Sequence, residues 1–183
     1  MRTPTELNAL TDALNFYTDN SPNAGTAMVG AEELTFRELD DNSSKVAAGL
    51  AHMGIGPGDR IAYLGDYSTS YWEALFACAK LGAVLVPLGK GTHNEDVDYA
   101  LEECHADLII RNSQHVILNS QGIEELALTP QQWEEWKTQY PPLMEYCFVE
   151  PDTPIVEEFC FADAGFVETK LYTHHDWLER WRA

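Results

Sequence analysis

Short uninterrupted apolar runs alternate along the chain with longer stretches in which apolar residues recur every three or four positions. The runs occupy residues 61–64, 83–86 and 108–110. Continuous apolar runs of this length are typical of strands that are buried on both faces. Strands that alternate with helices over short connections form parallel sheets with right-handed crossovers. The pattern therefore predicts a three-layer α/β domain with a mainly parallel sheet.

Hydroxyl and glutamate residues three positions apart mark three predicted helix starts. This spacing matches the capping box, in which the two side chains satisfy the N–H groups at the beginning of a helix. The pairs are Thr35 with Glu38, Ser70 with Glu73, and Thr92 with Glu95. The helices that follow the first two pairs are predicted to end at Gly54 and Gly82, because glycine is the usual residue just past a helix C-terminus.

Proline marks two more helices, since it is well tolerated in a first helical turn. Thr3 with Pro4 predicts an N-terminal helix, and Thr129 with Pro130 predicts one that carries Trp133 and Trp136. These tryptophans share a helix face, and we expect them to cover the domain rather than to hold a ligand.

Weaker patterns predict short strands at 27–29, 33–36 and 116–118. Residues 150–154 read as a linker. We therefore divide the chain into an α/β domain, 1–149, and a segment, 150–183, made of a linker, a loop and a C-terminal helix.

The chain is strongly acidic, with a formal net charge of −19 from 30 acidic and 11 basic residues. A field of this sign repels nucleic-acid phosphates and anionic lipids, so we expect neither nucleic acid nor membrane as a partner. The acidic residues occur in short clusters, which are typical of a solvated surface. The N-terminus lacks the apolar core of a signal peptide, and no apolar run has the length of a membrane span. These features predict a cytoplasmic protein.

Sequence motifs for catalysis or metal binding are weak. The four cysteines have no metal-binding spacing, and we expect neither a disulfide nor a zinc site. His174, His175 and Asp176 are adjacent, but neighbouring residues on a helix point in different directions. Asp176 is expected only to help start the last helix. No G-x-S-x-G motif of a serine hydrolase is present. We therefore assign no catalytic and no metal-binding residue.

Three motifs carry a resemblance to a known family. They are LTFREL at 34–39, GIGPGDRIA at 54–62 and YWEALFACAKLGAVLVPL at 71–88, and residues 99–110 continue the match. Together they resemble the N-terminal region of the adenylate-forming, or AMP-binding, superfamily of acyl-CoA synthetase type. The resemblance covers residues 5–112 well and 156–178 weakly. It implies the fold of that N-terminal subdomain.

The same resemblance implies a chemistry and the parts that this chemistry needs. Enzymes of the family activate a carboxylate as an acyl-adenylate with release of pyrophosphate, and most then pass the acyl group to a thiol. They need backbone N–H groups around the phosphates, magnesium, a nucleotide pocket and a lysine from a small C-terminal domain. Most of these parts lie beyond the region that this chain matches.

The family's phosphate loop reads approximately Y-T-S-G-T-T-G-x-P-K-G, with T-H a few residues later. A gapless alignment on Thr173–His174 places Phe159 at the tyrosine, Phe161 at the serine, Ala162 at the first glycine, Gly165 at the second and Glu168 at the lysine. Glutamate in place of lysine repels a polyphosphate, and the lost hydroxyls and glycine remove what a phosphate needs at close approach. Making Lys170 the loop lysine shifts the T-H anchor by two residues. We therefore expect a degenerate loop remnant (Ala162, Gly165, Glu168, Lys170) and no ATP or magnesium cofactor.

The last segment carries large apolar residues: Leu171, Tyr172, Trp177, Leu178 and Trp181. In a longer relative this region would be covered by later parts of the chain, and exposed apolar patches mark interfaces. We therefore expect these residues to bind a protein partner or a second copy of the chain.

The leading hypothesis is a truncated, non-catalytic homologue of an AMP-forming acyl-CoA synthetase, acting as a protein-interaction or regulatory module and not as an enzyme on its own. A second hypothesis is one subunit of a split ligase that a partner chain completes. A third is a carboxylate- or acyl-binding module that kept the crevice at the carboxyl ends of the strands. A fourth is a fragment or a decayed gene product.

Overall fold

The computed structural model describes residues 7–26, 34–89, 92–112, 120, 122–162 and 166–182. The helices are α1 (Leu10–Asn20), α2 (Phe36–His52), α3 (Thr69–Leu81), α4 (Asn94–Cys104), α5 (Pro130–Lys137) and α6 (His174–Arg182). The strands are β1 (Arg60–Leu64), β2 (Val84–Leu88), β3 (Leu108–Asn112), β4 (Glu124–Leu128), β5 (Pro154–Ala162) and β6 (Phe166–Thr173). The strands predicted at 27–29 and 116–118, and most of the one at 33–36, fall outside the described residues.

The six strands form one mixed sheet in the order β4-β3-β1-β2-β5-β6. Strands β1 to β5 all run in the same direction, and only β6, at the edge beside β5, runs antiparallel to them. Ile61 of β1 lies between Leu85 of β2 and Leu108 of β3. The predicted α/β class and mainly parallel sheet are confirmed.

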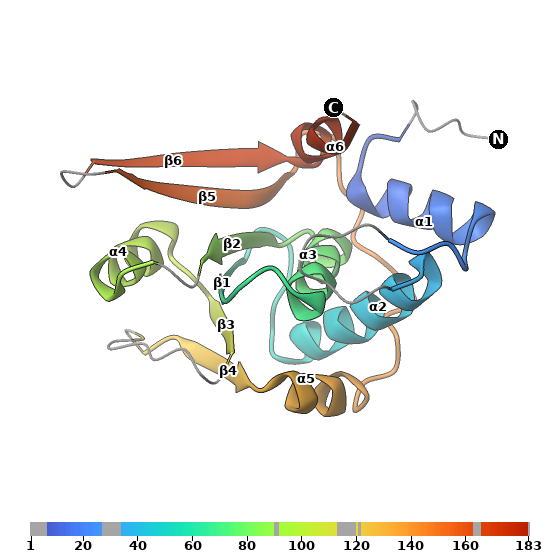
Figure 1. The fold of residues 1–183 in the computed structure, drawn as a ribbon, viewed down its shortest axis with the longest axis horizontal. Helices are drawn as coiled ribbons and strands as arrows, with labels where there is room; N and C mark the ends of the chain where they lie inside the picture. Colours follow the sequence, from blue (N-terminus) through green and yellow to red (C-terminus); the bar gives the residue numbers. More distant parts are fainter. Residues whose placement is uncertain are drawn as a thin grey trace.

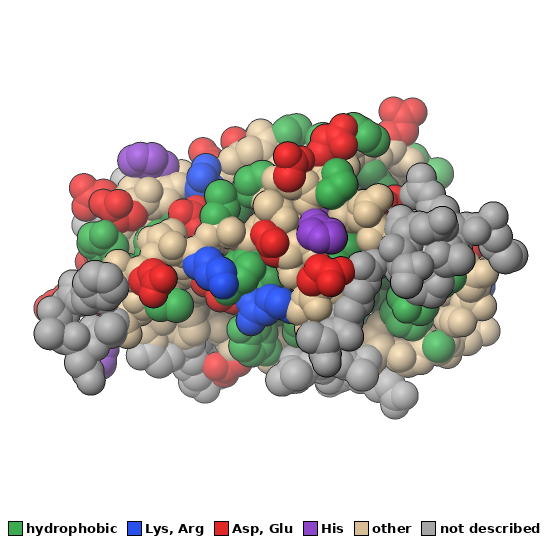
Figure 2. Space-filling view, turned by 90° about the horizontal axis from the view of Figure 1, so that it is seen from above, with side chains coloured by type: hydrophobic (Ala, Val, Ile, Leu, Met, Phe, Trp, Pro, Cys, Tyr) green, Lys and Arg blue, Asp and Glu red, His purple; other side chains and the backbone are tan. Residues whose placement is uncertain are grey.

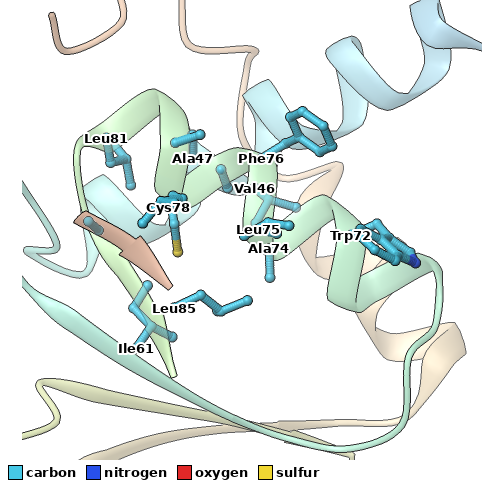
Figure 3. Close-up of a cluster of buried hydrophobic side chains, with 14 of the residues drawn as sticks. Val46, Ala47, Ile61, Trp72, Ala74, Leu75, Phe76, Cys78, Leu81 and Leu85 are labelled. Atoms are coloured by element: carbon cyan, nitrogen blue, oxygen red, sulfur yellow. The ribbon is translucent and has the colours of Figure 1, made fainter. Parts of the chain in front are cut away.

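Helices cover both faces of this sheet (Figure 1). Ile61 and Tyr63 of β1 contact a core cluster to which α1, α2, α3, α5 and α6 contribute. Ala62 and Leu64, which alternate with them, contact a second cluster built on α4. Burial on both faces is the physical reason for the continuous apolar runs. Figure 3 shows the larger cluster, where Ile61 and Leu85 meet side chains of α3 such as Leu75.

One of the three predicted capping boxes is present and two are absent. Thr35 caps α2, and Glu38 returns the bond to the backbone N–H of Thr35. At α3 the cap is Ser68, not Ser70, and at α4 the residue before the helix is His93, which makes no side-chain cap. The boxes predicted at Ser70 and at Thr92 were therefore wrong.

The N-terminal and C-terminal elements also differ from the prediction in their limits. Helix α1 begins at Leu10 after Ala9, which makes no side-chain cap, and Thr3 and Pro4 are outside the described residues. Strands β5 and β6 do not stand apart from the sheet, because β5 pairs with β2 through Leu85 and Val156. The predicted boundary after residue 149 thus falls within a single sheet. None of the described helices combines the length and hydropathy needed to cross a membrane.

A buried charged cluster attaches α5 to α3. Glu73 and Lys137 are 0% and 3% exposed, and their Oε1 and Nζ atoms are 2.8 Å apart. The Nε1 of Trp133 donates to Oε2 of Glu73 at 2.6 Å, and Lys137 also bonds Glu134 at the surface. Trp133 is 3% exposed, so the prediction that it covers the domain is confirmed.

A second buried cluster attaches residues 138–149 to α2 and α3. The Nζ of Lys80, whose side chain is fully buried, lies 2.8 Å from Oδ1 of Asp40 and also donates to the hydroxyls of Ser43 and Ser44. Its ammonium lies 4.9 Å from the ring centre of Tyr146. Burial lowers the pKa of Lys80 to about 8, against the opposing effect of Asp40. At neutral pH the cluster therefore holds a charged lysine inside the fold.

Candidate functional site

The hairpin of β5 and β6 occupies the position where the sequence resemblance places a phosphate loop. Its pairing continues to the tip, with Phe159 opposite Thr169, Phe161 opposite Val167, and Ala162 opposite Phe166. Only residues 163–165 lie between the last paired positions, and these, including Gly165, are outside the described residues. The ladder therefore includes Phe159, Phe161 and Ala162, three positions at which the gapless alignment places the loop.

Backbone pairing at these positions sets the directions of the N–H groups. In an antiparallel ladder successive N–H groups point to opposite edges of the strand. An anion site needs several N–H groups that converge on one point, as in a glycine-rich loop or at a helix N-terminus. The extended backbone at Phe161 and Ala162 offers no such convergence.

The two phenylalanines of β5 have a packing role. Phe159 and Phe161 lie against the cluster built on α4, and their rings stack at 6.2 Å. The gapless alignment places them at the loop's tyrosine and serine. A partly buried aromatic ring at the serine position supplies apolar contacts and no hydroxyl donor. The substitution at Phe161 therefore contributes to the hydrophobic core of the domain.

The two charged residues of the loop remnant lie at the surface of the hairpin. Glu168 and Lys170 are both exposed, on the same face of β6. The Nζ of Lys170 lies 4.7 Å from the ring centre of Tyr172, further from the hairpin tip than Lys170 itself. Arg180 lies 4.9 Å from the same ring and bonds Glu158 at 3.3 Å. Lys170 is thus drawn away from the tip. Figure 2 shows how acidic and basic side chains are interspersed on this side of the molecule.

The adjacent His174, His175 and Asp176 have separate structural roles. His174 is fully buried, and its Nδ1 accepts a hydrogen bond of 3.2 Å from the backbone N–H of Leu10. Burial lowers the pKa of His174 to about 4, so the imidazole is neutral at pH 7. Asp176 bonds the backbone N–H and the hydroxyl of Thr173, and these bonds lower the pKa of its carboxyl. The prediction that Asp176 helps to start the last helix is confirmed.

The apolar residues predicted to form an interface divide into two groups. Trp177 and Leu178 are 5% and 4% exposed and belong to the core, because α6 folds back against α1 and β5, so their assignment to an interface was wrong. Tyr172 is partly buried against the same core. Leu171 is 46% exposed and stays a predicted contact, whereas the side chain of Trp181 is outside the description.

A polar cluster that the sequence analysis missed lies at the carboxyl end of β1. The hydroxyl of Tyr63 lies 3.1 Å from Ser68 and 2.9 Å from Ser70, and the two serines lie 3.0 Å apart. Tyr67 beside it is 52% exposed and faces the ring of Trp72. The carboxyl ends of parallel strands are the usual ligand-binding edge of an α/β sheet. The three hydroxyls hydrogen-bond one another in a closed triangle.

No group of three or more His, Cys, Asp or Glu residues that could hold a metal ion occurs in the described ranges. Burial raises the pKa of Cys78 to about 12 and that of Cys104 to about 11, which keeps both thiols protonated and unreactive. At the loop position, the described residues form a hairpin that packs against the cluster built on α4.

Comparison of the fold with solved structures agrees with the sequence motifs. The N-terminal subdomain of NpsA from Klebsiella oxytoca, solved with 3-hydroxyanthranilyl-AMSN, superposes with a TM-score of 0.77 at 18% identity, over 95% of this chain and 43% of that one. VinN superposes with a TM-score of 0.80 at 16% identity, over 93% of this chain and 44% of that one. At these identities the likeness shows the fold alone.

Sequence comparison identifies the family. ScoC, a fatty acid–[acyl-carrier-protein] ligase of Streptomyces coeruleorubidus, is 26% identical over 94% of this chain and 34% of its own length. A feruloyl-CoA synthase of an Amycolatopsis species is 40% identical over 52% of this chain and 19% of its own. The chain thus spans only about a third of the first of these relatives. Residues 17–146 match the family described as AMP-binding enzyme, and the chain belongs to that family.

Proposed function

We propose that this subdomain does not bind ATP through the β5–β6 hairpin and that it acts through protein contacts, as an interaction or regulatory module derived from an adenylate-forming ligase. One observation carries the proposal. The ladder pairs Phe161 with Val167 and Ala162 with Phe166, at positions where the family pattern has its phosphate loop. This argument does not depend on the length of the chain, because a longer protein that contains this hairpin has the same ladder.

Electrostatics support the same conclusion. Glu168 stands at the position of the loop lysine, and the whole chain carries a net charge of −19. Two like charges repel at close range, and a polyphosphate bears several negative charges. A phosphate group beside the paired residues of the hairpin would thus meet repulsion as well as diverging N–H groups.

Calorimetric titration of the protein with magnesium and ATP tests the proposal, with a feruloyl-CoA synthase as the positive control. We expect a dissociation constant weaker than about 1 mM, which corresponds to less than about 4 kcal/mol of binding free energy. The Glu168→Lys variant separates charge from backbone geometry. It restores the charge of the family pattern but not the converging N–H groups, so we expect it to bind no better. Tight binding by the wild type, or by Glu168→Lys alone, would contradict the proposal.

A second candidate function is that of one part of a ligase whose nucleotide site is completed by further polypeptide. The relatives are favourable to this alternative, since the chain spans 34% of ScoC and 19% of the feruloyl-CoA synthase. Strand β6 is also an edge strand, which leaves one side open for pairing. This hypothesis predicts ATP–pyrophosphate exchange by an isolated complex but not by the chain alone. Exchange that is absent from every purified complex would exclude it.

A further inference from the structure

Residues 138–153, here called the strap, cross the domain from α5 to β5 (Figure 1). Their conformation is held by the helices beneath them. The N–H of Leu143 donates to the carbonyl of Ser44 at 3.0 Å, and the N–H of Cys147 donates to that of Lys80 at 2.8 Å. The hydroxyl of Tyr146 lies 3.0 Å from the hydroxyl of Ser44. The strap is thus an ordered surface of the domain, although it has no regular secondary structure.

Two large apolar side chains of the strap point into solvent. Met144 is 87% exposed and Phe148 is 82% exposed, whereas Leu143, Tyr146 and Cys147 between and beside them are partly buried. These are the two most exposed large apolar residues among the described part of the chain. The inward-facing side chains of the strap therefore pack against the domain, whereas Met144 and Phe148 face outward. Methionine and aromatic residues are enriched where proteins bind one another.

The surroundings of these two side chains are acidic. Glu145, Glu150 and Asp152 of the strap are all exposed. The strap itself contains these three acidic residues and no lysine or arginine, and the residue just before it is Lys137. Lys137 is 3% exposed and is neutralised by Glu73 and Glu134, so it does not offset this charge. The strap combines an apolar centre with a negative rim.

We propose that the strap is a docking site for a positively charged amphipathic segment of another protein, with apolar side chains against Met144 and Phe148 and lysines or arginines against the acidic rim. Charge distinguishes the possible binding partners of the strap. A second copy of this chain would set one acidic rim against another, and like charges across an interface are unfavourable. Anionic lipid headgroups are repelled in the same way. This inference deepens the interaction role proposed above and rests on it, but it is independent of whether ATP binds.

A random peptide library displayed on phage tests the proposal, with selection on the wild type and counter-selection on a Met144→Ser/Phe148→Ser variant. We expect the enriched peptides to carry net positive charge and bulky apolar residues. A synthetic peptide of the enriched sequence should lose at least about tenfold in affinity for the double variant, equal to about 1.4 kcal/mol. Its affinity should also fall with added salt, and Leu171→Ser, on β6, should bind it like the wild type.

The Glu145→Lys/Glu150→Lys variant is an independent probe, because it retains both apolar side chains. It should also weaken binding, and its substitutions are exposed and should leave the urea midpoint nearly unchanged. Enrichment of neutral or acidic peptides, or undiminished binding by both variants, would overturn the proposal. So would a homodimer, or adsorption to phosphatidylcholine vesicles, that is lost in Met144→Ser/Phe148→Ser. Failure here leaves the ATP result untouched, so the two proposals fail separately.

Discussion

Replacing Glu73 by glutamine should destabilise the domain severely, although the two side chains have nearly the same shape. The carboxylate of Glu73 is fully buried, 2.8 Å from the Nζ of Lys137. Glutamine can still accept the bond from Trp133, so the perturbation removes the charge alone. It leaves a lysine that is 3% exposed without its buried partner.

The size of the effect follows from the geometry of the pair. At 2.8 Å and an effective dielectric constant of about 20, the attraction between Glu73 and Lys137 is about 6 kcal/mol. Glu134, at 2.7 Å and 58% exposed, retains part of the stabilisation of the ammonium. Breaking a buried ion pair by removing one partner costs about 3 to 5 kcal/mol. We therefore expect Glu73→Gln to lower the free energy of unfolding by about 3 kcal/mol.

Urea unfolding followed by far-ultraviolet circular dichroism measures this loss. With a slope of about 2 kcal/mol per molar urea, the midpoint should fall by about 1.5 M at an unchanged slope. Glu134→Gln is the matched control, and as a half-exposed partner it should cost less than about 1 kcal/mol. Adding Lys137→Met to Glu73→Gln removes the ammonium that has lost its buried partner and should recover part of the loss. The reasoning is refuted if Glu73→Gln costs no more than Glu134→Gln, or if the double variant is the less stable one.

Three further predictions concern packing, pH and thiol reactivity. Gly49→Ala places a Cβ 2.7 Å from the ring of Trp136 and should destabilise the domain by about 1 to 3 kcal/mol in urea unfolding, although alanine normally favours a helix. His174 has a folded-state pKa of about 4 against 6.5 unfolded, so the unfolded chain binds more protons between these values. Its stabilisation, about 3 kcal/mol, is therefore complete above pH 6.5 and is lost as the pH falls toward 4, and His174→Asn should show a shallower pH dependence of the unfolding free energy. Cys160 is exposed and Cys78 is buried, so a thiol reagent should label the former in the folded protein and the latter only after denaturation.

Each of these three has an outcome that contradicts it. A Gly49→Ala variant more stable than the wild type would mean that α5 does not pack on α2 as described. Parallel pH profiles for the wild type and His174→Asn would mean that His174 is not a neutral buried group. Modification of Cys78 at the rate of Cys160 in the native protein would show that the cluster around α3 opens readily.

Prediction from the sequence succeeded where the signal is short-range and repeated. Apolar periodicity identified the buried strands, and the spacing of Thr35 and Glu38 located the start of α2. The same spacing misled at Glu73, because a local pattern cannot show that a tryptophan and a lysine about sixty residues later will meet the carboxylate. A buried cation binds a carboxylate more strongly than a backbone N–H at a solvated helix end does.

At the candidate site, the sequence identifies residue types and the structure adds their positions. The residues at the loop position, with Glu168 and two phenylalanines, already argued against phosphate binding. The reason that the structure adds is the register of the ladder, which depends on β5 joining the sheet beside β2. The large apolar residues near the C-terminus are evident in the sequence. Whether Trp177 and Leu178 are buried, however, depends on which surface covers them. The sequence shows which side chains are apolar but not which residues they contact.

By itself, then, the sequence determined the α/β class and the family, and it predicted a degenerate phosphate loop, because these depend on residue types and spacings along the chain. Only the tertiary structure decided that Glu73 is a buried partner of Lys137, that His174 is a buried link to α1, and that Met144 and Phe148 are left outside. Each of these depends on contacts between residues far apart in sequence. Burial and pairing are properties of the assembled fold, and no local pattern encodes them.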